Sequence, residues 1–286
     1  MNSPDWIPDF SELNSAFDFA IKEDIGDGDH SALSCLDLTK RGEAKLLIKQ
    51  EGIIAGIALA KYLFTYIDPT AKVQVRIKDG SRVYPGDIAL TVEANAVKLL
   101  QAERLVLNYT QRLSGVATSS AEYSKMVAHT STTILDTRKT TPGLRVLEKW
   151  AVSLGGGGNH RMGLYDMIML KDNHIDFAGG IIPAVTSVRE YLSDKQKSLK
   201  IEVETRDLQE VREALIAGAD RIMLDNFTTD ETSIAVALID RRAETESSGG
   251  ITKDSLVSYA ECGVDYISVG ALTHQIKSLD MSLKAL

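Results

Sequence analysis

The feature that most constrains the fold is a series of short apolar strands that alternate with amphipathic helical segments in the carboxyl-terminal half. The strand-like segments are STTILDTR from 131, MIMLK from 167, KIEVET from 200, RIMLDN from 221, the weaker RAETES from 242 and YISVG from 266. Such alternation predicts parallel strands joined by right-handed crossovers. Glu204, Asp225 and Glu246 recur at intervals of 21 residues, close to the repeat of a minimal β/α unit. We therefore expect an incomplete, TIM-like α/β barrel.

The first third of the chain has a different pattern. Strand-like pieces at 45–52 and 73–80 are mixed with turn signals, and a long helical pattern covers 94–115. We predict an α/β sandwich domain over residues 1–113, to which a carboxyl-terminal helix at about 276–286 returns. The barrel domain is then predicted over residues 114–275.

Composition excludes several classes of function. A chain of 286 residues with 44% apolar and 25% charged residues is typical of a globular protein. The formal net charge of -8 argues against a nucleic-acid-binding surface. No apolar run is long enough for a membrane helix and the amino terminus lacks a signal-peptide pattern, so we expect a cytoplasmic protein without a membrane partner. Cys35 and Cys262 form no metal-binding or redox motif and are predicted to be reduced thiols.

Positive charges gather at the predicted strand ends. In α/β barrels the chemistry lies at the carboxyl ends of the strands. The cations expected at that rim, with one histidine beside them, are Arg138, Lys139, His160, Arg161 and Lys171. Fixed cations that share one cavity repel each other unless an anion offsets them. The sequence therefore predicts a ligand with more than one negative charge, for which arginine offers a two-pronged match to carboxylates.

The glycine-rich segments predict two different roles. Gly155–Gly158 match no nucleotide-binding fingerprint, and we expect them to turn the backbone so that His160 and Arg161 reach the cavity. The small residues of SSGG at 247–250 and SVGA at 268–271 follow the last two predicted strands. Backbone N–H groups at such positions favour phosphate.

Acidic residues leave alternatives open. Glu204 and Asp225 end neighbouring predicted strands, where they could hold a hydrated Mg²⁺, bond to ribose hydroxyls, or balance the nearby cations. A transition-metal site built from His160, Asp172 and His174 is disfavoured, because two of its ligands lie only two residues apart at a strand exit. Arg104 and Arg112 lie on the long predicted helix, where a solvated face or a salt bridge is the simplest interpretation.

Eight segments in order resemble the quinolinate phosphoribosyltransferase family over nearly the whole chain. They are EDIGDGDHS near 23, AERLVLNYTQRLSGVAT from 102, LDTRKTTPGLR from 135, GGGGNHRMGLYDMIMLKDNHI from 155, IEVET from 201, IMLDNF from 222, SGGI from 248 and SVGALTH from 268. The resemblance implies transfer of phosphoribose from phosphoribosyl pyrophosphate (PRPP) to quinolinate. Decarboxylation then gives nicotinate mononucleotide for NAD synthesis, with Mg²⁺ required.

Residue roles follow from the same resemblance. It implies that the quinolinate pocket is lined by Arg138, Lys139, His160, Arg161 and Lys171, with Arg104 contributed across a homodimer interface; a higher oligomer is also compatible. It places Glu204 and Asp225 near ribose and metal, and the phosphate side at Ser248, Gly249, Gly250, Gly270 and His274. Lys139, Lys171, Glu204 and Asp225 are the expected catalytic residues.

Two departures from the family pattern and two rival functions remain. Gln275 stands where the family often has serine, and the segment before SGGI is unusually polar, which bears on the pyrophosphate contacts. One rival is a molybdenum-associated homologue with a different acceptor. The other is a catalytically silent barrel that binds a phosphorylated metabolite.

Overall fold

The computed structural model describes residues 6–286, which form two compact units. One unit contains the chain up to Ala121, together with Thr140–Gly156 and Ala271–Leu286. The other consists of Glu122–Lys139 and Gly157–Gly270. The predicted boundary at 113 falls inside a helix that continues to Met126, and residues 1–5 of the predicted first domain lie outside the described residues.

The first unit combines a sheet with several helices. Its elements are η1 (Phe10–Leu13), α1 (Asn14–Ile25), α2 (His30–Cys35), β1 (Arg41–Ile48), β2 (Gly52–Ile53), α3 (Ile57–Ile67), β3 (Lys72–Val75), β4 (Arg82–Val83), β5 (Ile88–Asn95), α4 (Ala96–Met126), α5 (Arg145–Leu154), α11 (Ala271–His274) and β12 (Met281–Ala285). The main sheet has the antiparallel order β12-β1-β5-β3, and β2 pairs with β4. Alternate residues of β1 are buried, which gives this sheet one apolar face.

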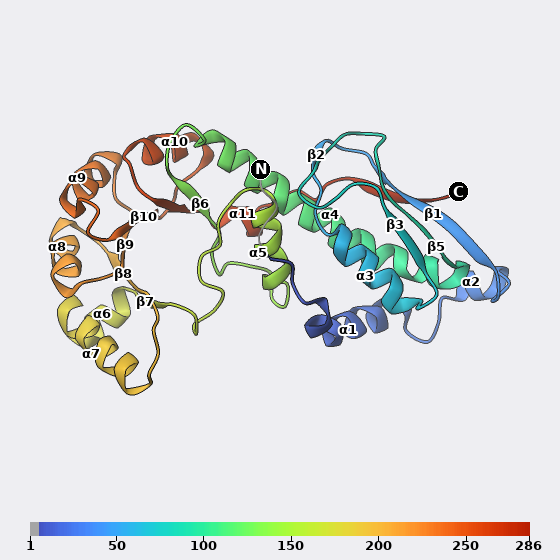
Figure 1. Ribbon diagram of the computed structural model, residues 1–286, viewed down its shortest axis with the longest axis horizontal. Helices are drawn as coiled ribbons and strands as arrows, with labels where there is room; N and C mark the ends of the chain where they lie inside the picture. Colours follow the sequence, from blue (N-terminus) through green and yellow to red (C-terminus); the bar gives the residue numbers. More distant parts are fainter. Residues whose placement is uncertain (1–5) are drawn as a thin grey trace. The chain divides into compact units, whose positions relative to one another are not determined.

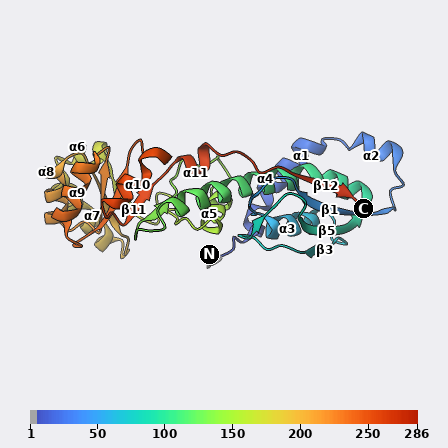
Figure 2. The ribbon, with the colours of Figure 1, turned by 90° about the horizontal axis from the view of Figure 1, so that it is seen from above.

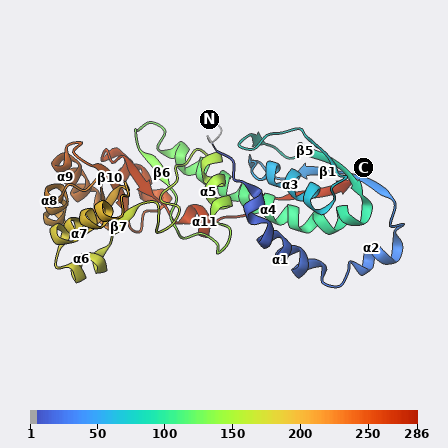
Figure 3. The same ribbon diagram turned by 60° about the horizontal axis from the view of Figure 1, so that its bottom comes forward.

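The predicted carboxyl-terminal helix is wrong, because residues 281–285 form strand β12. The chain returns to the first unit and β12 lies antiparallel beside β1 (Figures 2 and 3). Met281 and Leu283 are buried while Ser282 and Lys284, which alternate with them, are not. This period of two suits a strand, and the pairing satisfies the backbone groups that β1 would otherwise expose at its edge.

The second unit is the open α/β barrel that the sequence predicts. Its elements are β6 (Thr133–Leu135), β7 (Ile168–Leu170), α6 (Asp172–Ala178), α7 (Ile181–Asp194), β8 (Ile201–Thr205), α8 (Leu208–Ala217), β9 (Arg221–Asp225), α9 (Thr229–Ile239), β10 (Glu244–Ser248), α10 (Lys253–Glu261) and β11 (Tyr266–Ser268). All six strands are parallel, in the order β6-β11-β10-β9-β8-β7. The helices surround the strands on the outside (Figure 1).

Side-chain alternation divides the barrel strands into an apolar outer face and a polar inner face. Val203, Ile222 and Ile267 are fully buried among the apolar residues of the core. At the alternate positions, Glu202 of β8 lies opposite Arg221 of β9, and Glu246 of β10 lies opposite Met223 of β9. The interior of this barrel is therefore charged where most barrels are filled with branched apolar side chains.

No helix among the described residues is long and apolar enough to cross a bilayer.

Gly155 is required by close packing, which gives a stability prediction. A Cβ at this position would lie 2.2 Å from the Ala117 carbonyl oxygen of α4. Gly155→Ala should lower the free energy of unfolding by about 1–3 kcal/mol, because the backbone must shift. Gly42→Ala is the matched control, since its added Cβ would meet only ordinary contacts at 3.5 Å. Urea unfolding of both variants checks this, and equal losses would contradict it.

Candidate functional site

Polar side chains meet at the carboxyl ends of the barrel strands, as the sequence predicts. Lys171 follows β7, and its Nζ lies 2.6 Å from Oε2 of Glu204 at the end of β8. Asp225 ends β9, in register with Ser248 of β10. The pKa of the Asp225 carboxyl is raised, first by burial and then by the charge of Glu204, while Lys171 opposes the shift. Such a carboxylate pair gains stability from any cation that binds beside it.

The structure also brings two predicted cations together. The pKa of the Arg161 guanidinium is lowered by burial and then by the positive charge of Arg138. The guanidinium donates to the Met167 carbonyl oxygen at 3.3 Å and to Met169 Sδ at 3.4 Å, both uncharged atoms. A half-buried guanidinium held this way beside another cation favours an anionic ligand. Lys139 is exposed, and its backbone N–H donates to Thr137 Oγ1 at 3.0 Å.

The chain after the glycine run lies alongside β6. Gly158 forms a parallel bridge with Leu135, and an added Cβ there would lie 2.7 Å from Leu135 Cδ2. Asp136, which is fully buried, then accepts from the His160 backbone N–H at 2.9 Å and from Asn159 Nδ2 at 2.7 Å. The segment thus behaves as a short extra strand. It directs the side chain of His160 into the barrel.

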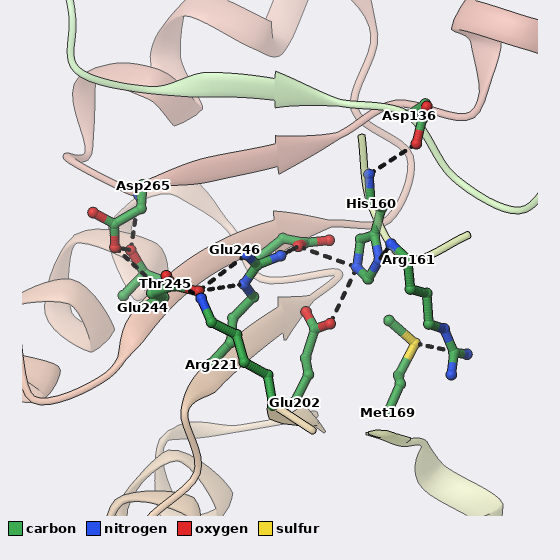
Figure 4. Close-up of polar contacts among 11 residues, drawn as sticks. Asp136, His160, Arg161, Met169, Glu202, Arg221, Glu244, Thr245, Glu246 and Asp265 are labelled. Carbon is green, nitrogen blue, oxygen red and sulfur yellow. Dashed lines mark hydrogen bonds and ion pairs between the residues drawn. The ribbon is translucent and has the colours of Figure 1, made fainter. Parts of the chain in front are cut away.

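His160 lies between two buried glutamates inside the barrel (Figure 4). Its Nε2 is 3.1 Å from Glu202 Oε2 and 3.4 Å from Glu246 Oε2, and both glutamates are fully buried. Glu246 also receives the Arg221 guanidinium at 3.0 Å. Arg221 in turn contacts Glu244 at 3.0 Å and lies 4.1 Å from the centre of the Tyr266 ring.

One proton is shared within this cluster. The two carboxylates outweigh the burial of His160 and raise its pKa to about 9, whereas burial and the charge of Glu246 raise the pKa of Glu202 to about 7. The Arg161 backbone N–H donates to His160 Nδ1 at 2.6 Å, so Nδ1 must keep its lone pair. At neutral pH these pKa values favour the extra proton on His160, whereas the Arg161 N–H at Nδ1 opposes it, so the ring and the Glu202 carboxyl compete for that proton.

The disfavoured transition-metal site does not form. His174 Nδ1 accepts the backbone N–H of Lys171 at 3.0 Å, at the start of α6. Within residues 6–286 the His, Cys, Asp and Glu side chains that converge as three potential ligands are His160, Glu202 and Glu246.

The loops after β10 and β11 hold the predicted phosphate-side residues. Gly249 has φ of 92° and Gly250 has φ of 62°, both in the left-handed region that favours glycine. A Cβ on Gly249 would lie 2.3 Å from Asn226 Oδ1, and Asn226 Nδ2 donates to Asp225 Oδ2 at 2.7 Å. This contact joins the phosphate-side loop to Asp225. The phosphate-binding roles of Ser248, Gly249, Gly250 and Gly270 stay predictions.

Two predicted ligand residues belong to the first unit. Arg104 is exposed on α4 and lines a cavity of about 350 Å³ with Glu23, Asp24 and Arg112. Arg112 forms a salt bridge of 2.7 Å with buried Glu148, which confirms the structural interpretation of this arginine. His274 ends α11 and is exposed. Binding of substrate by Arg104 or His274 stays a prediction.

Sequence reasoning assigns no functional role to Glu202, Glu246, Arg221 or Asp136. A signal was available, because β8 carries Glu202 and Glu204 two residues apart, and β10 carries Glu244 and Glu246 in the same way. Charges at alternate positions of a buried parallel strand point to one side of the sheet, and buried charges require partners.

An open α/β barrel whose strand ends combine clustered cations with a carboxylate pair belongs to the class of barrels that bind anionic ligands at the carboxyl rim. Residues 116–284 match the quinolinate phosphoribosyl transferase C-terminal domain and residues 29–114 match its N-terminal domain. The chain belongs to the quinolinate phosphoribosyl transferase family.

Relatives agree over nearly the full length. The chloroplastic nicotinate-nucleotide pyrophosphorylase (carboxylating) of Arabidopsis thaliana is 46% identical, with 96% of this chain and 82% of that protein covered. A probable nicotinate-nucleotide pyrophosphorylase (carboxylating) of Bacillus subtilis is 43% identical, with 95% and 93% covered. The solved nicotinate-nucleotide pyrophosphorylase of Francisella tularensis has a TM-score of 0.93 at 36% identity, with 100% of both chains covered.

Proposed function

We propose that this protein transfers phosphoribose from PRPP to quinolinate and releases carbon dioxide and pyrophosphate, giving nicotinate mononucleotide in NAD biosynthesis. Both relatives are named nicotinate-nucleotide pyrophosphorylase (carboxylating), and this chain matches most of their lengths. The structural observation that carries the proposal is Arg161, a half-buried guanidinium held beside Arg138 by uncharged atoms. Glu202 and Asp166 only partly offset the burial and the repulsion, and a pyridine with two carboxylates would supply further negative charge.

The barrel rim suits the chemistry of this reaction. The ring nitrogen of quinolinate attacks the anomeric carbon of ribose while pyrophosphate leaves, and positive charge develops on the sugar. Glu204 and Asp225 lie at the strand ends where their carboxylates can stabilise that charge. Loss of carbon dioxide leaves the electron pair of the broken bond on the ring carbon, where the neighbouring positive nitrogen stabilises it, and a proton from water then adds to that carbon. The protein needs to orient the ring and exclude water, and no covalent enzyme intermediate is required.

Mg²⁺ fits the carboxylate pair and is proposed as the companion of PRPP. The pKa of Asp225 is raised first by burial and then by the charge of Glu204, and a hydrated cation beside both carboxylates would offset these two effects. Bound Mg²⁺ would neutralise charge on the leaving pyrophosphate. Product formation from quinolinate and PRPP should therefore stop when EDTA is added and return with excess Mg²⁺. An unchanged rate in EDTA would contradict this prediction.

The choice of acceptor separates the rivals. With PRPP and Mg²⁺ present, release of carbon dioxide from labelled quinolinate should accompany nicotinate mononucleotide formation in equal amounts. Nicotinate offered instead should be a poor acceptor, because it leaves one cationic contact without a carboxylate. Preference for another pyridine acid would support the molybdenum-associated homologue. Binding of both substrates without pyrophosphate release would support the silent barrel.

A shared active site can be tested by mixing inactive proteins. We propose that Arg104 serves the site of a second copy in a homodimer. Arg104→Ala and Arg138→Ala proteins should each be inactive, and a mixture that exchanges subunits should regain activity. Half of the dimers in an equal mixture are mixed and each has one intact site, so about a quarter of all sites should work. Absence of recovery, despite exchange shown by mass spectrometry, would contradict the shared site.

A further inference from the structure

The backbone N–H groups of His160 and Arg161 are both held by buried side chains (Figure 4). The His160 N–H donates to Asp136 Oδ1 at 2.9 Å, and the Arg161 N–H donates to His160 Nδ1 at 2.6 Å. The other ring nitrogen, Nε2, faces Glu202 and Glu246. Rotation of the ring would therefore break the buried hydrogen bond at Nδ1 and the contacts of Nε2 with the carboxylates.

The side chain of His160 is directed away from solvent. Only 5% of its surface is exposed, whereas the neighbouring Arg161 is half-buried. Both nitrogens of the ring have protein partners at 2.6 Å and 3.1 Å. The ring therefore has no nitrogen left over with which to bind a carboxylate of a ligand.

One of the two glutamates beside the ring, Glu246, is itself fixed. Glu246 receives the Arg221 guanidinium at 3.0 Å, and Arg221 also reaches Glu244 at 3.0 Å. Lys200 adds a second cation to Glu244 at 2.7 Å. These contacts run across β8, β9 and β10, so the barrel frame itself sets the position of the histidine ring.

We propose that His160 is a positioning residue: clamped between Glu202 and Glu246, it fixes the backbone amide of Arg161 and so aims the Arg161 guanidinium at the acceptor carboxylates. This inference rests on the proposed function. It assigns Glu202 and Glu246 to the support of that arginine and separates them from Glu204 and Asp225. Groups that orient a ligand-binding residue commonly change affinity by about 10- to 100-fold when removed.

A double-mutant cycle tests the proposal directly. KM and kcat for quinolinate and for PRPP are measured in the wild type, His160→Ala, Arg161→Ala and the double variant. If His160 acts through Arg161, His160→Ala should raise KM for quinolinate about tenfold and leave KM for PRPP unchanged. The double variant should then resemble Arg161→Ala within about twofold. Effects that multiply would mean that His160 binds the substrate independently, and would overturn the proposal.

Conservative variants distinguish positioning from general stability. In His160→Asn the side-chain oxygen lies near the place of Nδ1 and can accept the Arg161 N–H, so KM for quinolinate should stay within about threefold of the wild-type value. His160→Leu lacks that acceptor and should show the full rise in KM. The proposal would be overturned if the two variants had equal KM values for quinolinate. It would also be overturned if kcat and melting temperature fell together while KM rose equally for both substrates.

The glutamate provides a second route if the histidine variants fold poorly. Glu202→Gln keeps an oxygen acceptor for the Nε2–H of His160 and should bind quinolinate within about threefold of the wild type, whereas Glu202→Leu should weaken binding about tenfold. Calorimetry with quinolinate alone measures both. Unchanged binding in Glu202→Leu would overturn the proposal. Failure of the wild type itself to bind or convert quinolinate would instead overturn the proposed function, and this inference with it.

Discussion

Replacing Arg161 with alanine is expected to lower kcat/KM for quinolinate by about 100- to 1,000-fold, because removal of one member of a desolvated charge pair costs about 3–4 kcal/mol. The guanidinium donates to uncharged atoms of Met167 and Met169, and burial and Arg138 lower its pKa despite the opposing charges of Glu202 and Asp166, so a ligand carboxylate beside it would be stabilising. KM for PRPP should change little. Steady-state kinetics with each substrate varied in turn measures the effect.

Charge and shape at this position can be separated. Arg161→Lys keeps the charge but loses the two-pronged donor. Its kcat/KM for quinolinate should therefore lie between the values for the wild type and Arg161→Ala. Arg212→Ala is a suitable control, since Arg212 is exposed on the outer helix α8 and donates only to the Leu208 carbonyl oxygen of the same helix. A loss in Arg161→Ala that is confined to PRPP would contradict the assignment of Arg161 to the quinolinate side.

The barrel strands were predictable because apolar segments and the spacing between them can be recognised in short stretches of sequence. Apolar segments at 200–205 and 221–226 become β8 and β9, and even the weak segment at 242–247 becomes β10. β10 gave a weak signal because Glu244 and Glu246 interrupt it. Their charges are tolerated in the barrel because Arg221 and His160 reach them from other elements. Single-strand patterns cannot reveal such distant partners.

The end of the chain was predicted wrongly for a related reason. Apolar and polar residues alternate only over 281–284, which is too short a pattern to decide between helix and strand, and pairing with β1 more than 200 positions earlier makes the choice. The segment 140–156 was assigned to the barrel, yet it belongs to the first unit, where α5 packs Gly155 against α4. Long-range packing decided both outcomes.

At the site, the sequence predicts which residues lie close together but not which partners each side chain contacts. Lys171, Glu204 and Asp225 lie together at the strand ends, and Arg138 lies close enough to Arg161 to lower its pKa. The sequence predicts that His160 reaches the cavity but not what surrounds it there, because Asp136 holds its backbone and two glutamates contact its ring from other elements. Motif order identifies residues, whereas their hydrogen-bond partners define what each can do.

Glu204→Gln is expected to lower kcat by about 100- to 1,000-fold, the usual cost of removing a preorganised electrostatic contact to a charged transition state. The substitution keeps the size of the side chain, and its amide oxygen can still accept from Lys171 Nζ, which lies 2.6 Å from Oε2. What it removes is the negative charge that would oppose the positive charge developing on ribose. Burst experiments that follow pyrophosphate separate this chemical step from product release.

The same substitution on the outside of the barrel provides the comparison. Glu190→Gln changes an exposed residue of α7 and should leave kcat within about twofold, since surface charges contribute little. Lys171→Met should also reduce activity, because it leaves the Glu204 carboxylate without its cation and removes one attraction for the substrate anions. If Glu204→Gln instead kept kcat and raised only KM for PRPP, Glu204 would serve binding alone. Ribosyl-cation stabilisation would then have to be assigned to Asp225, whose carboxyl already shows the raised pKa that marks a charge in need of a counter-ion.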